Sequence, residues 1–244
     1  MRGTQNSVYI GTSGWSYGHW QGPFYPENMS SEEQLKFYAE EFSCVEINNS
    51  FYKLPDEKTL RHWRNTVTED FLFTVKASRY ITHMKKIKDS SDSVTRFLKH
   101  ISVLQPRLGP VLFQLPPNWK FNEKRLSEFL ASLSREFRYT FEFRDRSWLN
   151  PRAYEILAKY DTAFCIYDFN GFLSPREVTT DFVYIRLHGP GDAYEGEYDK
   201  QSLAGWAGAI SSWSSQGKDV FCFFDNDQSG YAPLNARSLK SMIQ

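Results

Sequence analysis

Short runs of hydrophobic residues recur along the chain, and most are followed by a segment in which hydrophobic residues have helical spacing. The runs are rich in Val, Ile, Phe and Tyr and are bounded by turn residues, which is typical of β-strands. We therefore predict eight strands, over residues 7–13, 43–48, 71–77, 110–116, 138–144, 162–168, 182–188 and 219–226.

The segments between these runs predict helices in all but one connection. In residues 90–104, for example, Val94, Phe97, Leu98 and Ile101 recur at helical intervals. We predict helices over residues 30–42, 56–66, 90–104, 122–133, 150–160, 200–213 and 232–243. The sixth connection, residues 169–181, shows no helical pattern.

Strands that alternate with helices favour parallel pairing through right-handed crossovers. Eight such strands in 244 residues favour a single α/β domain with the (β/α)8 architecture of a TIM-type barrel. An open, doubly wound sheet is the alternative. No linker, low-complexity stretch or internal repeat interrupts the chain, so we predict one domain over residues 1–244.

The ends of the predicted strands are polar, although barrel strands are buried on both faces and are expected to be apolar. Side chains alternate along a strand, so the polar residues of each strand share one face, which we infer points into the barrel. The carboxyl ends of barrel strands converge where active sites lie. The sequence therefore predicts a polar pocket formed by Thr12, Glu46, Asn48, Lys76, Gln114, Glu142, Arg144, Asp168, Arg186, His188 and Asn226.

These residue types indicate acid–base chemistry on a polar substrate. Glu46 and Glu142 are candidates for a catalytic carboxylate pair, and His188 is a candidate proton shuttle near neutral pH. Lys76 could act as an electrophile, an anion ligand or an imine-forming amine. The alternative is a structural lattice in which the buried charges neutralise one another. The expected substrate-binding residues are Asn48, Lys76, Gln114, Arg144, Asp168, Arg186, Asn226, Trp15, Tyr52 and Trp148.

Two loops add to this picture. The segment GTSGWSYGHWQGPFYP, residues 11–26, is either a packed lid or an aromatic platform for a sugar face or a base. The segment KASRYITHMKKIKD, residues 76–89, is either a solvated basic surface or a binding site for phosphates. The sequence alone leaves both pairs of alternatives open.

Composition limits the partners. Lys plus Arg and Asp plus Glu each number 29, so no global basic field favours nucleic acid or an anionic membrane. Cys44, Cys165 and Cys222 lie in apolar runs and predict free thiols in a reducing compartment. The chain start lacks a signal-peptide pattern, and no apolar run could span a bilayer, so we predict a cytoplasmic protein.

No sequence motif indicates a bound cofactor. A divalent metal held by Glu46, Glu142, Asp168 and His188 is a minor alternative, because a multinuclear zinc centre needs more convergent ligands than the chain supplies. The oligomeric state is left open, since the surface pattern predicts no clear interface.

Several motifs occur in the order typical of one known family: GTSGWSY, VEINNSFY, LFQLPP, EFRDRSW, IRLHG and DNDQSGYAPLNA. Together they resemble the YecE-like family, also described as domain of unknown function seventy-two, over nearly the whole chain. The resemblance implies a TIM-type barrel and implies no activity. Members usually show a paired asparagine where this chain has FFDND, so Asp225 is a departure beside Asn226.

We expect an enzyme, a hydrolase, lyase or isomerase, that acts on a small polar or phosphorylated sugar-like metabolite. One alternative is a nucleic-acid-processing barrel of endonuclease type, for which the basic loop and the aromatic loop are the arguments. A second alternative is a barrel that binds a metabolite without catalysis.

Overall fold

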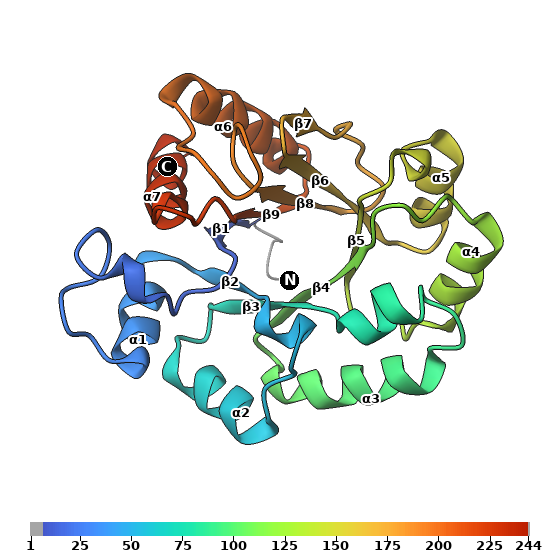
Figure 1. The fold of residues 1–244 in the computed structure, drawn as a ribbon, viewed down its shortest axis with the longest axis horizontal. Helices are drawn as coiled ribbons and strands as arrows, with labels where there is room; N and C mark the ends of the chain where they lie inside the picture. Colours follow the sequence, from blue (N-terminus) through green and yellow to red (C-terminus); the bar gives the residue numbers. More distant parts are fainter. Residues whose placement is uncertain (1–6, 244) are drawn as a thin grey trace. The chain divides into compact units, whose positions relative to one another are not determined.

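The computed structural model describes residues 7–243 (Figure 1). Residues 1–6, on which part of the signal-peptide prediction rests, and residue 244 lie outside the described residues. The eight main strands are β1 (Val8–Thr12), β2 (Cys44–Ile47), β3 (Leu72–Lys76), β4 (Leu108–Leu115), β5 (Tyr139–Phe143), β6 (Ala163–Phe169), β8 (Phe182–Leu187) and β9 (Asp219–Phe224).

The long helices lie where the sequence predicts them. They are α1 (Ser31–Glu41), α2 (Glu57–Thr66), α3 (Ser91–Ile101), α4 (Glu123–Ser132), α5 (Pro151–Lys159), α6 (Lys200–Ser215) and α7 (Tyr231–Ile243). Side-chain caps explain where several of them begin. Ser30 and Glu33 form a reciprocal capping box at α1, and Asn150 accepts the Ala153 N–H at the start of α5.

The strand order identifies the fold class. Neighbouring strands follow the order β1-β9-β8-β6-β5-β4-β3-β2, so the first strand pairs with the last. The β1–β9 pairing is parallel and runs in register from Val8↔Val220 to Thr12↔Phe224. An open doubly wound sheet reverses its strand order at a switch point, whereas a barrel keeps sequential order. The predicted (β/α)8 TIM-type fold is confirmed, and the open-sheet alternative is wrong.

Two local features depart from a regular barrel. The sixth connection has no helix in the described chain, as predicted, but it contains a short strand that the sequence pattern does not predict, β7 (Phe172–Leu173), antiparallel to β6. The basic loop contains a π-helix, Tyr80–Met84, in which the Lys85 N–H donates to the Tyr80 carbonyl at 2.9 Å. π-Helices are rare in proteins as a whole, but those that do occur are frequently found at functional sites.

Two compact units make up the described chain. Unit 1 holds the described residues up to Val45, Ile166–Ser174 and those from Asp181 onward, and unit 2 holds Glu46–Cys165 and Pro175–Thr180. Each unit is described by itself below. The single domain expected from the sequence stays a prediction.

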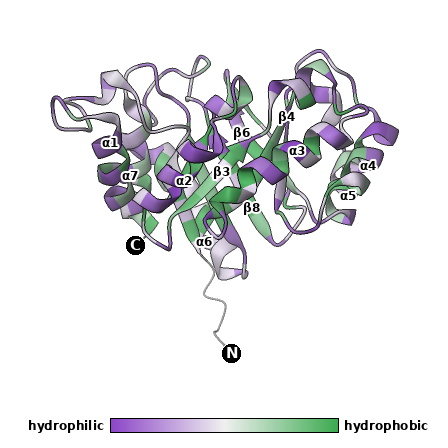
Figure 2. Cartoon of the chain, turned by 90° about the horizontal axis from the view of Figure 1, so that it is seen from below, coloured by the Kyte–Doolittle hydropathy of each residue, from purple (hydrophilic) through white to green (hydrophobic). Residues whose placement is uncertain are grey.

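Hydrophobic residues concentrate on the strands, while the helices carry hydrophilic residues on part of their surface (Figure 2). In unit 2, Phe113 stacks on Phe141 across the β4–β5 pairing, and Phe129 of α4 packs edge-on against Phe113. In unit 1, the aromatic loop after β1 is tightly packed, with Trp20 and Phe24 buried edge-to-face. Burial favours the packed-lid interpretation of this loop over an open aromatic platform.

Candidate functional site

In unit 2, the polar strand ends are positioned by strand pairing and by one loop contact. Gln114 on β4 lies in register with Glu142 on β5. The Ser50 hydroxyl, in the turn after β2, donates to the Lys76 carbonyl at 2.7 Å and so ties the Asn48 turn to the end of β3. We call Asn48, Lys76, Gln114, Glu142 and Arg144 the unit 2 cluster.

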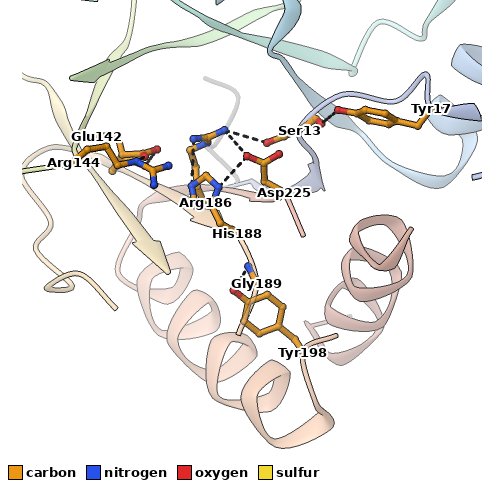
Figure 3. A network of polar contacts seen from close by, with 10 residues as sticks. Ser13, Tyr17, Glu142, Arg144, Arg186, His188, Gly189, Tyr198 and Asp225 are labelled. Carbon is orange, nitrogen blue, oxygen red and sulfur yellow. Dashed lines mark hydrogen bonds and ion pairs between the residues drawn. The ribbon is translucent and has the colours of Figure 1, made fainter. Parts of the chain in front are cut away.

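A buried ion pair lies within the unit 2 cluster. The Glu142 carboxylate contacts the Arg144 guanidinium through Oε1 and Nε, and both side chains are almost completely buried (Figure 3). The Cys165 thiol lies 3.9 Å from Glu142 Oε2. Because a buried carboxylate needs a compensating charge, Arg144 balances the charge of Glu142 and holds it in place.

Some buried oxygens of unit 2 have no hydrogen-bond partner among the described residues, including Asn48 Oδ1, Gln114 Oε1 and Thr140 Oγ1. Thr140 precedes Glu142 by two positions and therefore shares its face of β5. A buried polar atom left without a partner costs about 1–3 kcal/mol, so such atoms need an explanation. A ligand or an ordered water that donates hydrogen bonds would satisfy them.

Positive charge gathers around His83 in the π-helix of unit 2. Burial, followed by the charges of Lys76, Arg79 and Arg144, lowers the pKa of His83 from 6.5 to about 4. Lys76 Nζ also lies 4.5 Å from the centre of the Phe51 ring, which meets the His83 ring edge to face. The surroundings of His83 therefore suit an anion.

In unit 1, the polar strand ends form a different arrangement (Figure 3). Arg186 Nη2 donates to Asp225 Oδ2 at 3.0 Å and lies 3.5 Å from the Ser13 hydroxyl. The Nδ1 atom of His188 lies 2.9 Å from the same Asp225 oxygen. We call Ser13, Arg186, His188 and Asp225 the unit 1 network.

The two neighbours of His188 assign its proton. Arg186 Nη1 lies 3.3 Å from His188 Nε2, and a guanidinium can only donate, so Nε2 is an acceptor. The Asp225 carboxylate can only accept, so a proton on Nδ1 suits the 2.9 Å contact between these two atoms. Both ring nitrogens thus face partners within the network, which favours a positioning role for His188. Its predicted role as a proton shuttle stays a prediction.

Asp168 and its neighbours lie at the ends of β6 and β8 in unit 1. The Tyr198 hydroxyl donates to Asp168 Oδ2 at 3.1 Å and accepts the Gly189 N–H at 3.0 Å. Burial raises the pKa of Asp168, although Tyr198 and His188 oppose the shift. Gly189 has φ +121° and a Cβ there would lie 2.1 Å from the Glu195 carbonyl, so only glycine fits this turn.

Asn226 anchors two segments of unit 1. Its Nδ2 donates to the Gly196 carbonyl and to Asn235 Oδ1, both at 2.8 Å, and so joins the loop after β8 to helix α7. These contacts describe a structural role for Asn226. Its predicted role in substrate binding stays a prediction.

The three aromatic residues predicted to bind substrate differ in exposure. Trp15 is buried, and its carbonyl accepts the Tyr25 hydroxyl at 2.6 Å. Trp148 is fully buried, stacks on Phe143 and donates its indole N–H to the Trp119 carbonyl at 2.5 Å. Tyr52 is 82% exposed. Of the three, Tyr52 alone presents a largely open ring.

The described residues contain no group of three or more His, Cys, Asp or Glu side chains placed to hold a metal ion. Within the same residues, no helix combines the length and the apolar character needed to cross a bilayer. Cys44, Cys165 and Cys222 are buried free thiols. The cytoplasmic location and the small-molecule partner stay predictions.

Comparison with known proteins identifies the family. The model of a family described as "Protein of unknown function DUF72" matches residues 9–244. The chain belongs to the DUF72 family. This membership confirms the resemblance carried by the ordered motifs, and it supplies no activity.

Curated relatives and a solved structure agree with DUF72 membership. YecE of Escherichia coli is 37% identical over 138 residues, which cover 56% of this chain and 48% of YecE, so the match spans about half of that relative. YunF of Bacillus subtilis is 26% identical over 97% of this chain and 94% of its own. A crystal structure of a DUF72 protein from Thermotoga maritima has a TM-score of 0.88 at 30% identity, covering 98% of this chain and 99% of the other.

Several residues of this DUF72 protein that act on the predicted site residues escape sequence reasoning. Asp225, the partner of both Arg186 and His188, stands out in the sequence only as a departure from the family pattern. Its place next to Asn226 at the end of β9 is the available signal. Tyr198 and His83 lie outside the strands, where strand periodicity gives no information about which side chains approach a site.

Proposed function

We propose that the unit 2 cluster binds a small, anionic, hydroxyl-bearing metabolite, such as a sugar phosphate or a sugar acid. One observation carries this proposal: buried, unpartnered oxygens of Asn48 and Gln114 lie in the same unit as the positive charges that lower the pKa of His83. Hydroxyl groups of a ligand would donate to the amide oxygens, and its anionic group would bind the cations.

Each part of the unit 2 cluster has a role in this proposal. Lys76, together with Arg79, binds the anionic end of the metabolite, since the charges of both act on His83. Asn48 and Gln114 accept hydrogen bonds from its hydroxyl groups. A ligand that neutralises the cations would also remove the repulsion that disfavours the charged form of His83.

Glu142 is the proton acceptor of the proposed reaction. Its pairing with Arg144 supplies an oriented carboxylate, and Gln114 lies beside it in the strand register, where a bound hydroxyl would approach. The reaction class stays open among hydrolase, lyase and isomerase. The role of Glu46, which is fully buried at the end of β2, stays a prediction.

The test follows binding by two independent measurements. Sugar phosphates, sugar acids and neutral sugars are screened by thermal shift, and each hit is followed by NMR titration of the His83 ring protons. A bound anion should raise the pKa of His83 from about 4 toward 6.5, because it offsets the positive field. Lys76→Met should weaken binding about tenfold, since it removes one charged partner.

The matched control is Lys53→Met, an exposed lysine in the loop after β2, which should leave affinity unchanged. A metabolite that binds without changing the pKa of His83, and with an affinity that Lys76→Met does not change, must bind elsewhere. That result would refute the proposed site. If the Glu142→Gln variant converts the bound metabolite as fast as the original protein, Glu142 is not the proton acceptor. The proposed binding site would not be affected by that result.

A second candidate function is binding of single-stranded nucleic acid by unit 2. Tyr52 and Tyr80 are exposed, and Lys85 Nζ lies 5.8 Å from the centre of the Tyr80 ring. Exposed aromatic rings beside cations suit base stacking and phosphate contact. Fluorescence anisotropy with labelled oligonucleotides at low salt tests it, and binding unaffected by Tyr52→Ala and Tyr80→Ala would count against this surface.

A further inference from the structure

A separate cavity in unit 2 lies beside the starts of helices α3 and α4. Its volume is about 400 Å³, and its lining includes Lys88, Ser90, Ser91, Lys124 and Arg125. None of these residues belongs to the unit 2 cluster. The volume falls in the range of cavities that hold small ligands.

Helix α3 begins in this cavity without a side-chain cap. Ser90 occupies its N-cap position, yet the Ser90 side chain makes no capping hydrogen bond. By contrast, Asn122 caps α4 by accepting the Arg125 N–H. The first backbone N–H groups of an α-helix have no partner within the helix and attract anions. An uncapped start therefore leaves room for a ligand to accept these hydrogen bonds.

The Ser90 hydroxyl gives an independent indication of a ligand. Ser90 is only 3% exposed and lines the cavity, and its Oγ has no hydrogen-bond partner among the described residues. A buried hydroxyl is normally satisfied by protein or by ordered water. A phosphate oxygen could accept a hydrogen bond from this hydroxyl and from the backbone at the start of α3.

Charge at the cavity is mixed but favours an anion. Lys88, Lys124 and Arg125 face two acids, Asp89 and Glu128, on the same lining. The pairs Lys88–Asp89 and Lys124–Glu128 are long, at 3.9 Å and 3.8 Å, and are solvent-exposed, so each lysine can turn toward a ligand at little cost. The positive end of the α3 dipole adds to this potential.

The backbone before α3 supports the same interpretation. Ile87 is β-branched and buried, and it has φ +54°, while Asp89 has φ +43°. A left-handed conformation is unfavourable for a β-branched residue such as Ile87 and persists where the surroundings impose it, often near binding sites. The turn they form directs the chain into the uncapped start of α3.

We propose that this cavity binds the phosphate group of a small phosphorylated molecule, held by the Ser90 hydroxyl, the first backbone N–H groups of α3, Lys124 and Arg125. The proposal is independent of the function assigned to the unit 2 cluster. Free phosphate and a phosphate monoester share the same recognised group, and the experiment separates them.

The test is an NMR titration of the chain of residues 1–244 with inorganic phosphate and, separately, with glycerol phosphate, at constant ionic strength. Saturable shifts of the Ser91 and Asp92 amide signals are expected, with sulfate or chloride giving smaller ones. Ser90→Ala and Lys124→Met should each weaken the affinity, by about threefold to tenfold. Tighter binding of glycerol phosphate than of phosphate would identify a monoester as the ligand class.

Two control variants keep the result specific. Lys58→Met, on the exposed surface of α2, and Lys76→Met, in the unit 2 cluster, should leave these amide shifts unchanged. If Lys76→Met abolished the amide shifts, phosphate would be binding at the unit 2 cluster instead, and the proposal would be overturned. The absence of saturable shifts, or an affinity that neither Ser90→Ala nor Lys124→Met changes, would overturn it as well. Lys124 is exposed, so its variant tests the proposal even if Ser90→Ala disturbs the fold.

Discussion

The unit 1 network and the unit 2 cluster are built from the same kinds of residue but differ in how their polar atoms are used. In unit 1, Arg186 and His188 share the Asp225 carboxylate, so the charge of the buried guanidinium is balanced inside the network. In unit 2, buried oxygens of Asn48 and Gln114 have no partner among the described residues. Polar strand ends in one fold can therefore be paired with one another, as in unit 1, or be left available for the ligand that we propose for unit 2.

The largest expected effect comes from removing the shared carboxylate of unit 1. Asp225→Ala leaves the buried Arg186 guanidinium without this counter-ion, which typically costs about 3–5 kcal/mol. Chemical denaturation of the original protein and of the Asp225→Ala variant gives the difference between their free energies of unfolding. A loss below about 1 kcal/mol would show that the unit 1 network is not the stabilising element that the comparison requires.

Asp225→Asn is the control for that variant. An asparagine oxygen can still accept from Arg186, so the loss should be smaller than for Asp225→Ala. Equal losses for the two variants would mean that the negative charge of Asp225, rather than its packing or hydrogen bonding, accounts for its contribution.

A smaller effect is expected in unit 2, where Gln114→Met removes an unpartnered oxygen. The free energy of unfolding should stay within about 1 kcal/mol of the original or should rise, because no described residue loses a hydrogen bond to that oxygen. The stability given by a bound metabolite should fall at the same time. Denaturation with and without the thermal-shift hit measures both, and a loss of several kcal/mol in the free protein would place Gln114 in a structural network instead.

The last expected effect depends on pH and concerns His83. The unfolded chain binds a proton at His83 below about pH 6.5, whereas the folded protein binds it only near pH 4. The contribution of His83 to the free energy of unfolding should therefore fall as the pH drops through this window, and this contribution should change no further below it. His83→Gln should flatten the decline, as measured by denaturation at several pH values; an unaltered slope would assign the decline to other groups.

The fold is predictable because its signals are local and repeated. Each hydrophobic run and each capped helix is visible in a few adjacent residues, as at Asn150 and Pro151 before α5. The candidate site is predictable only to the level of strand ends. Periodicity places Glu142 and Gln114 on polar faces, and the parallel register then brings them side by side.

Pairing between side chains is not predictable in the same way. The residue type of His188 suggests a proton shuttle, but its contacts to Arg186 and Asp225 bring in a residue far away in the chain. Burial separates Trp148 from Tyr52, although both follow strand ends in the sequence. Such distinctions depend on packing, which a single sequence pattern does not encode.

The π-helix at Tyr80–Met84 has a consequence for how the length of this segment could change. Its i to i+5 hydrogen bond, from the Lys85 N–H to the Tyr80 carbonyl, encloses one residue more than an ordinary helical turn. A single-codon insertion or deletion here would interconvert the two kinds of turn and leave the flanking β3 and α3 intact. A change of one residue in the length of this segment would thus alter the direction of the His83 side chain and of the neighbouring cationic side chains. The strands of the barrel would stay unchanged.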